Sequence, residues 1–238
     1  MTHGSDRRIS DDEQYYREHA SEFGWGVEVA RLDTERVGLL NRYVVGHRIL
    51  DVACGSGMYT DYLASRGFDA WGIDLVGEFI LKAKESKKGT YLQGEADKLP
   101  FADGDFDTVL LFDILEHGDD VAILKEAKRV AAKRIVVNVP RKVDMELQRT
   151  GIVFGHYIDK SHMREYTEDS IRSLAHECGL EIIHLQGSSH INPLDVYKAL
   201  FSGNLFVKRV IKVILMTFLN TRYYPTGYFA VFDSDYGG

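Results

Sequence analysis

Short apolar runs alternate with amphipathic segments along most of the chain. The run at residues 48–53 ends just before Gly55 and Gly57, which is the pattern of a buried strand that enters a tight glycine turn. Similar runs recur further along, separated by segments with helical periodicity. Because this alternation requires crossover connections, it predicts an α/β fold whose sheet is mostly parallel and has helices on both faces.

The pattern predicts seven strands, six helices and a further basic helical stretch at residues 193–220, in one domain with two insertions, because no internal repeat and no flexible linker divides the chain. The predicted strands are residues 48–53, 68–74, 90–94, 106–113, 134–139, 180–185 and 228–232. The predicted helices are residues 10–23, 27–43, 58–66, 77–85, 119–132 and 167–178. The two insertions lie at residues 141–166 and 188–223. The order of these elements favours a doubly wound sheet.

The composition excludes several classes of protein. The 238 residues are 45% hydrophobic and 27% charged, close to the average of soluble domains, so collagen-like, low-complexity and disordered chains are excluded. Two cysteines cannot build a disulfide framework and suit a reducing cytosol. Residues 1–12 are polar and lack the apolar core of a signal peptide. We therefore expect a cytoplasmic protein.

The charge is unevenly distributed. The net charge of -7 argues against a nucleic-acid partner, because phosphate binding requires a basic surface. Residues 196–232 nevertheless contain five cations and no acidic residue. The apolar run at 205–219 is too short and too charged to span a membrane. Several interpretations stay open for this segment: a peripheral contact with an anionic membrane, a contact with a negatively charged substrate, a lid, part of the core, or an ordinary solvated helix face.

Carboxylates follow the ends of three successive predicted strands. Asp51 lies at the end of the first strand, where it would repel a pyrophosphate and favour a ligand with cationic character. Thr60 occupies a position where dinucleotide-binding turns have Gly or Ala. Asp74 can accept hydrogen bonds from ribose hydroxyls, and Asp97 can accept one from an adenine amino group. Together they predict one crevice for an adenosyl ligand and disfavour a nicotinamide dinucleotide.

These motifs resemble those of the class I S-adenosylmethionine-dependent methyltransferases, in particular the small-molecule branch that includes ubiquinone and menaquinone methyltransferases. The resemblance rests on residues 51–57, Asp74, residues 96–101 and residues 106–117, in that order. It covers residues 45–140 well and residues 167–185 weakly. It implies a Rossmann-like fold, S-adenosylmethionine as cofactor, and O-, N- or C-methylation of a small molecule, with apolar and anionic metabolites among the candidates.

The resemblance also implies a set of site residues. Residues 1–45 would form a helical cover in which Tyr16 closes the cofactor pocket, and the two insertions would lie on the substrate side. The cofactor-binding residues would be Asp51, Gly55 and Gly57 around the methionine part, Asp74 and Leu75 at the ribose, Ala96 and Asp97 at the adenine, and Phe112 and Asp113 through their backbone.

Methyl transfer is an in-line displacement, so the enzyme must mainly hold the acceptor close and aligned. A hydroxyl acceptor also needs a base, for which His156 and His117 are the candidates. Tyr157, His162 and Arg164, in the insertion at 141–166, are candidate substrate-binding residues. We expect no metal site, because the acidic residues and histidines show no tight ligand spacing.

Two other functions stay open. The chain could be a catalytically inactive, methyltransferase-like binding module that serves a partner. It could also be a nicotinamide-dependent oxidoreductase, which Asp51 and Thr60 disfavour. The sequence leaves the acceptor, the accepting atom and the oligomeric state undefined.

Overall fold

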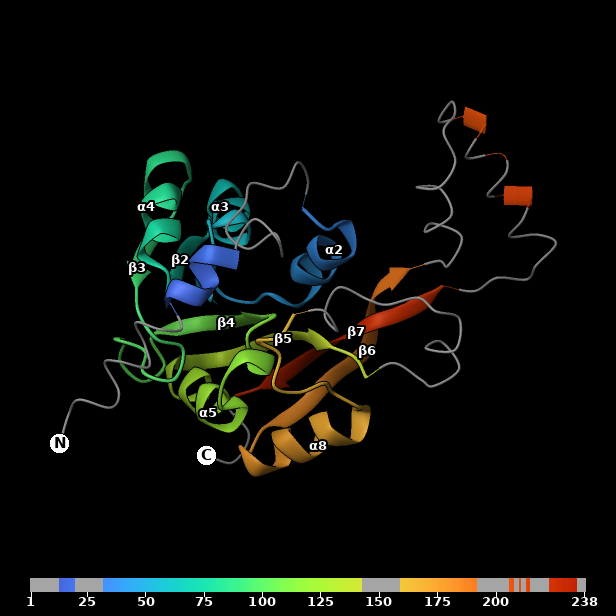
Figure 1. Cartoon of the computed structure of the whole chain (residues 1–238). Helices are drawn as coiled ribbons and strands as arrows, with labels where there is room; N and C mark the ends of the chain where they lie inside the picture. The colour runs from blue at the N-terminus through green and yellow to red at the C-terminus, as the bar shows by residue number, and fades with distance from the viewer. Residues whose placement is uncertain are drawn as a thin grey trace.

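The computed structural model describes residues 13–19, 32–142, 159–191, 206–207, 210, 213–214 and 223–234. Seven strands form one sheet in the order β3-β2-β1-β4-β5-β7-β6 (Figure 1). Neighbouring strands are parallel, except that β7 runs antiparallel to both β5 and β6. The strands are β1 (Arg48–Val52), β2 (Asp69–Asp74), β3 (Thr90–Gln93), β4 (Phe106–Phe112), β5 (Ala131–Pro140), β6 (Glu181–Ile191) and β7 (Tyr224–Asp233). The predicted fold class is confirmed.

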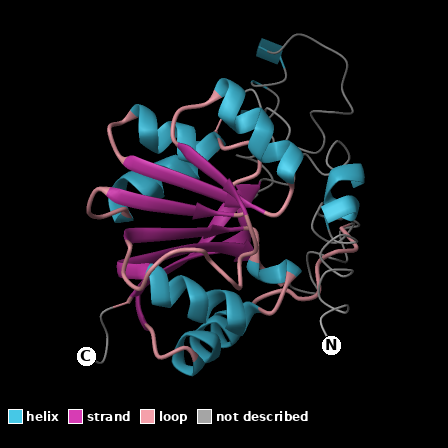
Figure 2. Cartoon of the chain, turned by 90° about the vertical axis from the view of Figure 1, so that its left-hand side faces the viewer, coloured by secondary structure: helices cyan, strands magenta, loops and turns pink. Residues whose placement is uncertain are grey.

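Two layers of helices cover the sheet (Figure 2). The helices are α2 (Thr34–Tyr43), α3 (Met58–Ser65), α4 (Gly77–Ser86), α5 (Asp120–Val130) and α8 (Glu168–Glu177), with a 3₁₀ turn, η1 (Leu115–His117), after β4. Successive strand residues point to opposite faces, so Ile49 packs with α2 and α3, whereas Leu50 packs with α5 and α8. Both faces of the sheet are therefore buried, as the continuous apolar strands require.

Several predicted boundaries are wrong. Helix α2 begins at Thr34, because Asp33 caps it by accepting a hydrogen bond from the Arg36 N–H at 2.7 Å. Helix α5 ends at Val130, because Ala131 already pairs with Phe106 in the sheet. Strands β6 and β7 are longer than predicted and stay paired as far as residues 191 and 224, so the second insertion begins after residue 191. Residues 27–31 lie outside the described part of the chain.

The sheet order brings the carboxyl ends of β1, β2 and β4 to one edge. The chain leaves β1 toward β2 on one side and continues with β4 on the other side, so the strand order reverses between β1 and β4. At such a switch point, open α/β sheets form a ligand-binding crevice outside the carboxyl ends of the strands. The residues Ala53 and Asp113, which directly follow these two strands, have positive φ angles of 58° and 54°. Such backbone conformations are uncommon for residues other than glycine and cluster at functional sites.

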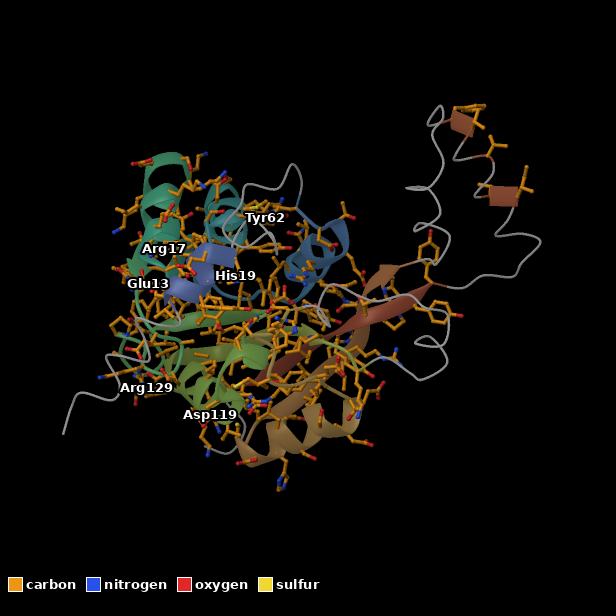
Figure 3. The ribbon with its side chains drawn as sticks, viewed as in Figure 1. Glu13, Arg17, His19, Tyr62, Asp119 and Arg129 are labelled. Atoms are coloured by element: carbon orange, nitrogen blue, oxygen red, sulfur yellow. The ribbon has the colours of Figure 1, made fainter. Side chains whose placement is uncertain are left out.

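A short helical segment at residues 13–19 lies across this edge (Figure 1, in blue next to α4). Its Glu13 Oε1 accepts a hydrogen bond from the Gly77 N–H at 3.1 Å, just after β2 (Figure 3). The Tyr16 ring meets the His117 ring edge-on, with centroids 5.6 Å apart, just after β4. The segment thus touches both sides of the crevice. None of the helices in the described part of the chain has the length and apolar character needed to traverse a bilayer.

Candidate active site

The glycine turn after β1 is held from inside by two buried polar side chains. Asp51 is 3% exposed, and its Oδ2 accepts a hydrogen bond from the Thr60 Oγ1 at 2.8 Å. Thr60 is fully buried on α3. The Thr60 hydroxyl therefore stabilises the Asp51 carboxylate by a hydrogen bond, and a Gly or Ala at position 60 would leave Asp51 without this donor.

Gly57 is required for packing as well as for the shape of the turn. It has a φ of +80°, and a Cβ placed there would lie 2.5 Å from Cε1 of Tyr91. Tyr91 is a buried residue of β3. The sequence indicates only a close approach of a ligand to this glycine, whereas the structure adds a close approach of the neighbouring ring.

Asp74 joins the glycine turn to the end of β2. Its Oδ2 accepts a hydrogen bond from the Gly55 N–H at 2.8 Å, and its Oδ1 accepts one from the Val76 N–H at 2.9 Å. The carboxylate is 8% exposed. The Gly94 N–H donates to the Asp74 carbonyl oxygen at 3.0 Å, which brings the loop after β3 to the same place. That loop carries Ala96, half-buried, and Asp97, exposed.

Burial makes this end of the crevice electrostatically unusual. Desolvation raises the pKa of Asp51 from 3.8 to about 7; the bond from Thr60 lowers it, and the nearby Asp74 raises it further. Desolvation also raises the pKa of Asp74. Two carboxylates that are this poorly solvated are stabilised in their charged form by a neighbouring cation, so the turn favours a positively charged ligand group.

The β4 side of the crevice is built on an ion pair that the sequence did not indicate. Arg36 of α2 holds the Asp113 carboxylate in a two-pronged contact, at 2.5 Å through Nη1 and 3.0 Å through Nη2. The Asn138 Nδ2 donates to Asp113 Oδ1 at 2.9 Å, and the Ser188 Oγ donates to Asn138 Oδ1 at 2.9 Å. Burial raises the pKa of Asp113, but Arg36 outweighs it, so the net shift is downward. Asp113 therefore stays ionised.

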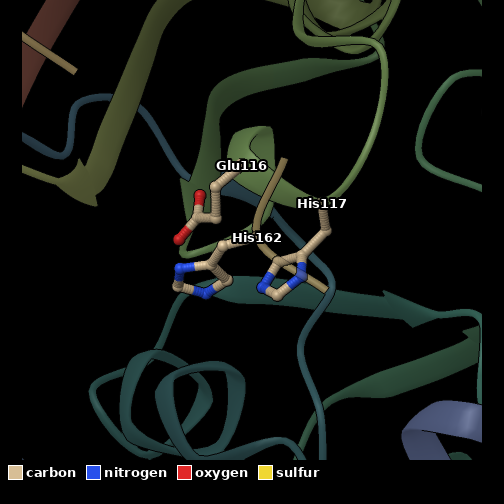
Figure 4. A group of neighbouring side chains, drawn as sticks. All are labelled: Glu116, His117 and His162. Atoms are coloured by element: carbon tan, nitrogen blue, oxygen red, sulfur yellow. The ribbon is translucent and has the colours of Figure 1, made fainter. Parts of the chain in front are cut away.

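Two histidines and a glutamate meet just beyond Asp113 (Figure 4). Glu116 and His117 belong to η1, and His162 comes from the segment before α8; one ligand-type atom of each lies within 4.8 Å of the other two. The His117 and His162 ring centroids are 4.6 Å apart. The sequence predicted roles for both histidines but missed Glu116, which is 1% exposed.

Burial sets the protonation of this cluster. Desolvation is the main cause that lowers the pKa of His117 to about 4, and the charge of a protonated His162 would lower it further. Desolvation also lowers the pKa of His162. Desolvation, and then the charge of Asp113, raise the pKa of Glu116 well above its ordinary range. Both imidazoles are therefore neutral near pH 7 and have a lone pair to offer.

The structure places the remaining predicted residues as follows. Arg164 Nη1 donates to the carbonyl oxygens of Leu115 and Gly118, at 3.2 and 2.6 Å, and lies 2.9 Å from Asp120 Oδ1. These contacts hold η1 in place, and a contact with substrate stays a prediction. Leu75 follows β2, and its carbonyl oxygen accepts a hydrogen bond from the Gln93 Nε2 at 3.0 Å. Phe112 is buried at the end of β4. His156 and Tyr157 lie outside the described residues.

The raised pKa of Asp51 gives a testable pH dependence of stability. Between pH 4 and 7 the carboxyl group ionises in the unfolded chain but stays protonated in the folded one, so the free energy of unfolding falls over that window and stays reduced above it. The amide that D51N introduces cannot ionise and keeps an acceptor for Thr60. We expect D51N to melt higher than wild type at pH 8, by about 2–4 °C for each ~1 kcal/mol, and the difference to shrink toward pH 4.

Differential scanning calorimetry of the ligand-free protein across this pH range measures the effect. The matched control is D169N, at an exposed position in the first turn of α8. A D51N variant that melts below wild type at pH 8, or a difference that does not change with pH, would contradict the burial of this charge.

Comparison with known proteins shows which proteins this chain is similar to. A family model described as a methyltransferase domain matches residues 50–134, the stretch from β1 into β5 that contains the glycine turn, Asp74, Asp113 and η1. A ubiquinone biosynthesis O-methyltransferase of Methylococcus capsulatus is 35% identical over 96 residues, which are 38% of this chain and 40% of that protein. A demethylmenaquinone methyltransferase of Beutenbergia cavernae is 27% identical over 188 residues, 71% of this chain and 75% of that protein.

The alignable stretch spans 31 to 40% of the length of the first three curated relatives. Likeness of fold extends further. The crystal structure of the magnesium protoporphyrin IX methyltransferase of Synechocystis, with bound S-adenosylhomocysteine, superposes with a TM-score of 0.59 at 15% identity and covers 94% of this chain and 98% of that one. Residues 50–134 therefore resemble the methyltransferase-domain family in sequence, and the fold is similar to that of solved methyltransferases.

Proposed function

We propose that this protein transfers a methyl group from S-adenosylmethionine to a small-molecule acceptor. The observation that carries the proposal is the carboxylate-lined glycine turn, in which Asp51 and Asp74 are both buried beside Gly55. Such a turn repels phosphate and favours a ligand with a cationic group, as the sulfonium and the amino group of S-adenosylmethionine are. The fold likeness to a methyltransferase with bound S-adenosylhomocysteine supports the same cofactor.

The cofactor would lie along the carboxyl ends of the strands. The charge of Asp51 complements the methionine part, held close to the backbone of Gly55 and Gly57. Each oxygen of Asp74 accepts one backbone N–H and has a second lone pair, which is suited to a ribose hydroxyl. The residues proposed to complete the pocket are Leu75, Ala96, Asp97, Phe112, Asp113 and Tyr16.

The acceptor would then lie on the η1 side of the crevice. In the transfer, a lone pair of the acceptor attacks the methyl carbon, the carbon–sulfur bond breaks with its electrons going to sulfur, and the cofactor becomes neutral at that atom. A hydroxyl acceptor also releases its proton. His117 and His162 are neutral near pH 7, so each has a lone pair that can accept a hydrogen bond from that hydroxyl, but their lowered pKa values make both weak bases for the proton itself. The proposed base His156 and the proposed substrate residues Tyr157 and Arg164 stay predictions.

An apolar acceptor is supported by the relatives and by residues 206–214. The relatives are named for ubiquinone and menaquinone methylation. Five apolar residues of this stretch are helical and between 41 and 72% exposed, namely Phe206, Val207, Val210, Val213 and Ile214. Their spacing is that of one helix face, and Lys208, Arg209 and Lys212 alternate with them in the sequence. This pattern suits a peripheral contact with an anionic membrane from which an apolar acceptor is drawn.

The alternative is a binding module that keeps the fold without catalysis. The intact network of Asp51, Thr60, Gly55 and Asp74 speaks against it, because a chain released from cofactor binding has no reason to keep two buried carboxylates. Cofactor binding with no methylated product from a panel of phenols, quinols, amines and carboxylic acids would favour this alternative.

Cofactor binding has a direct thermal test. We expect S-adenosylhomocysteine at ~100 times its Kd to add about 2.7 kcal/mol to the free energy of unfolding, or roughly 5–10 °C in Tm for a domain of this size. D74A should lose most of this shift, because it removes the carboxylate that fixes the turn. The control D169A, on α8, should keep it. Absence of a shift in wild type with either cofactor form, or a shift with NADH instead, would contradict the proposal.

Membrane contact is tested by co-sedimentation with vesicles. We expect the protein to sediment with vesicles that contain phosphatidylglycerol and not with pure phosphatidylcholine. Neutralising Lys208, Arg209 and Lys212 to Gln should weaken binding roughly 100-fold, at about 1 kcal/mol per cation near the surface. The matched control neutralises Lys82, Lys84 and Lys88, which are exposed on or next to α4. Equal sedimentation of both triple variants would refute this contact.

A further inference from the structure

Glu116, His117 and His162 lie close together, and among the described residues two of their buried polar atoms, one on Glu116 and one on His162, are unsatisfied. Glu116 Oε2 and His162 Nδ1 are buried and have no hydrogen-bond partner within the part of the chain that the structure describes. Each atom therefore carries the desolvation penalty of an unsatisfied buried polar group. Both lie in the group whose ligand-type atoms are within 4.8 Å of one another, and Figure 4 shows the Glu116 carboxylate directed toward the His162 ring, with His117 beside it.

A second layer of polar groups orients both histidines. Asp159, which is 6% exposed, accepts hydrogen bonds from the N–H of Ser161 at 2.9 Å and from its Oγ–H at 2.6 Å. The Ser161 hydroxyl proton is thereby committed to Asp159, so its oxygen accepts from Nδ1 of His117, 2.9 Å away. The other carboxylate oxygen of Asp159 lies 3.4 Å from Nε2 of His162.

These contacts favour one tautomer of each histidine. In that tautomer His117 has its proton on Nδ1 and its lone pair on Nε2, and His162 has its proton on Nε2, on the side of Asp159, and its lone pair on Nδ1. A carboxylate that holds the far N–H of each ligand histidine is the usual outer layer of a metal site, because it orients the ring and raises its basicity. Here the Asp159 carboxylate lies next to the His162 ring directly and is linked to His117 through the Ser161 hydroxyl.

We propose that Glu116, His117 and His162 bind one divalent first-row metal ion, with Zn²⁺ as the reference ion. Two imidazole nitrogens and one carboxylate oxygen are a ligand set that such ions accept, and three protein ligands leave a coordination position open. The ion satisfies the orphaned atoms of Glu116 and His162 together and neutralises a carboxylate that is otherwise costly to ionise in this position.

The sequence predicts no metal site, and this proposal goes against that expectation. The prediction rested on ligand spacing along the chain, but residues 116–117 and residue 162 come from separate segments. They meet because the Met163 N–H donates to the Glu116 carbonyl oxygen at 2.9 Å, and because Arg164 holds the carbonyl oxygens of Leu115 and Gly118.

The role of the ion rests on the proposed methyl transfer, although its binding does not. A metal-bound hydroxyl ionises far more easily than a free one, because the ion stabilises the anion, as it does for bound water. The acceptor would then be an oxygen acid, such as a phenol or an enol. Its proton leaves to water and the oxygen lone pair attacks the methyl carbon. The site thus narrows the proposed acceptors to oxygen compounds that can approach a metal ion.

The binding test uses the whole chain after treatment with EDTA. Titration with Co²⁺ should give visible absorption bands that saturate at one equivalent, and Zn²⁺ should abolish them. Competition with a chelator dye then gives the Zn²⁺ affinity. We expect H162N and E116Q each to weaken it by about tenfold or more, whereas H176N and E177Q, at exposed positions of α8, leave it unchanged. Absence of the Co²⁺ bands, or equal Zn²⁺ affinity in all four variants, overturns the proposal.

The outer layer gives a second, independent readout. D159N and S161A keep all three ligands and remove only the groups that orient them, so each should weaken Zn²⁺ binding by about 10- to 100-fold. Circular dichroism identifies any variant that fails to fold. The S-adenosylhomocysteine melting shift should survive in H162N, because the proposed ligands lie outside the glycine turn. If H162N loses Zn²⁺ binding but keeps the S-adenosylhomocysteine melting shift, the metal site and the cofactor site are separate. If the wild-type protein binds Zn²⁺ but shows no melting shift with S-adenosylhomocysteine, the proposed methyl transfer is refuted and the proposed metal site still stands.

Discussion

The hydrogen bond from the Gly55 N–H to the Asp74 carboxylate is the contact on which the site depends. It joins the turn after β1 to the end of β2, and the second oxygen of the same carboxylate holds the start of the next connection through the Val76 N–H. The glycine turn therefore has a fixed position relative to the neighbouring strand before any ligand arrives. In a parallel sheet the carboxyl ends of the strands lie at one edge, and the Asp74 carboxylate fixes the loops after β1 and β2 relative to each other at that edge.

Charge is arranged differently on the two sides of the crevice. Beside β1 and β2, Asp51 and Asp74 are buried, and desolvation rather than a cationic neighbour dominates the shifts in their pKa values. Beside β4, Asp113 is neutralised by Arg36 and tied to Asn138. The first side is suited to a cationic ligand. The second is a fixed ion pair next to two neutral histidines, on the side where we propose that the acceptor lies.

The sequence predicted the strands along the chain, the glycine turn and the position of Asp74, because apolar periodicity and glycine chemistry are local signals, but it did not predict the order of the strands in the sheet. It could not predict Arg36 as the partner of Asp113 or Glu116 as a buried residue, because both depend on contacts between distant segments. In the sequence, Thr60 indicated only that a nicotinamide dinucleotide is a poor ligand. Its hydrogen bond to Asp51 could not be predicted, because it forms only when α3 packs against β1. The end of α5 was misplaced because Ala131 and Ala132 suit a helix, whereas pairing with β4 decides the outcome.

The central claim is that the carboxylate-lined turn between β1 and β2 receives an adenosyl ligand whose cationic groups face Asp51. A crystal structure of the protein with S-adenosylhomocysteine tests it most directly. The account predicts ribose hydroxyls within hydrogen-bond distance of the Asp74 carboxylate and the amino acid part beside Gly55. A ligand bound elsewhere, with Asp51 and Asp74 still facing only the protein, would contradict it.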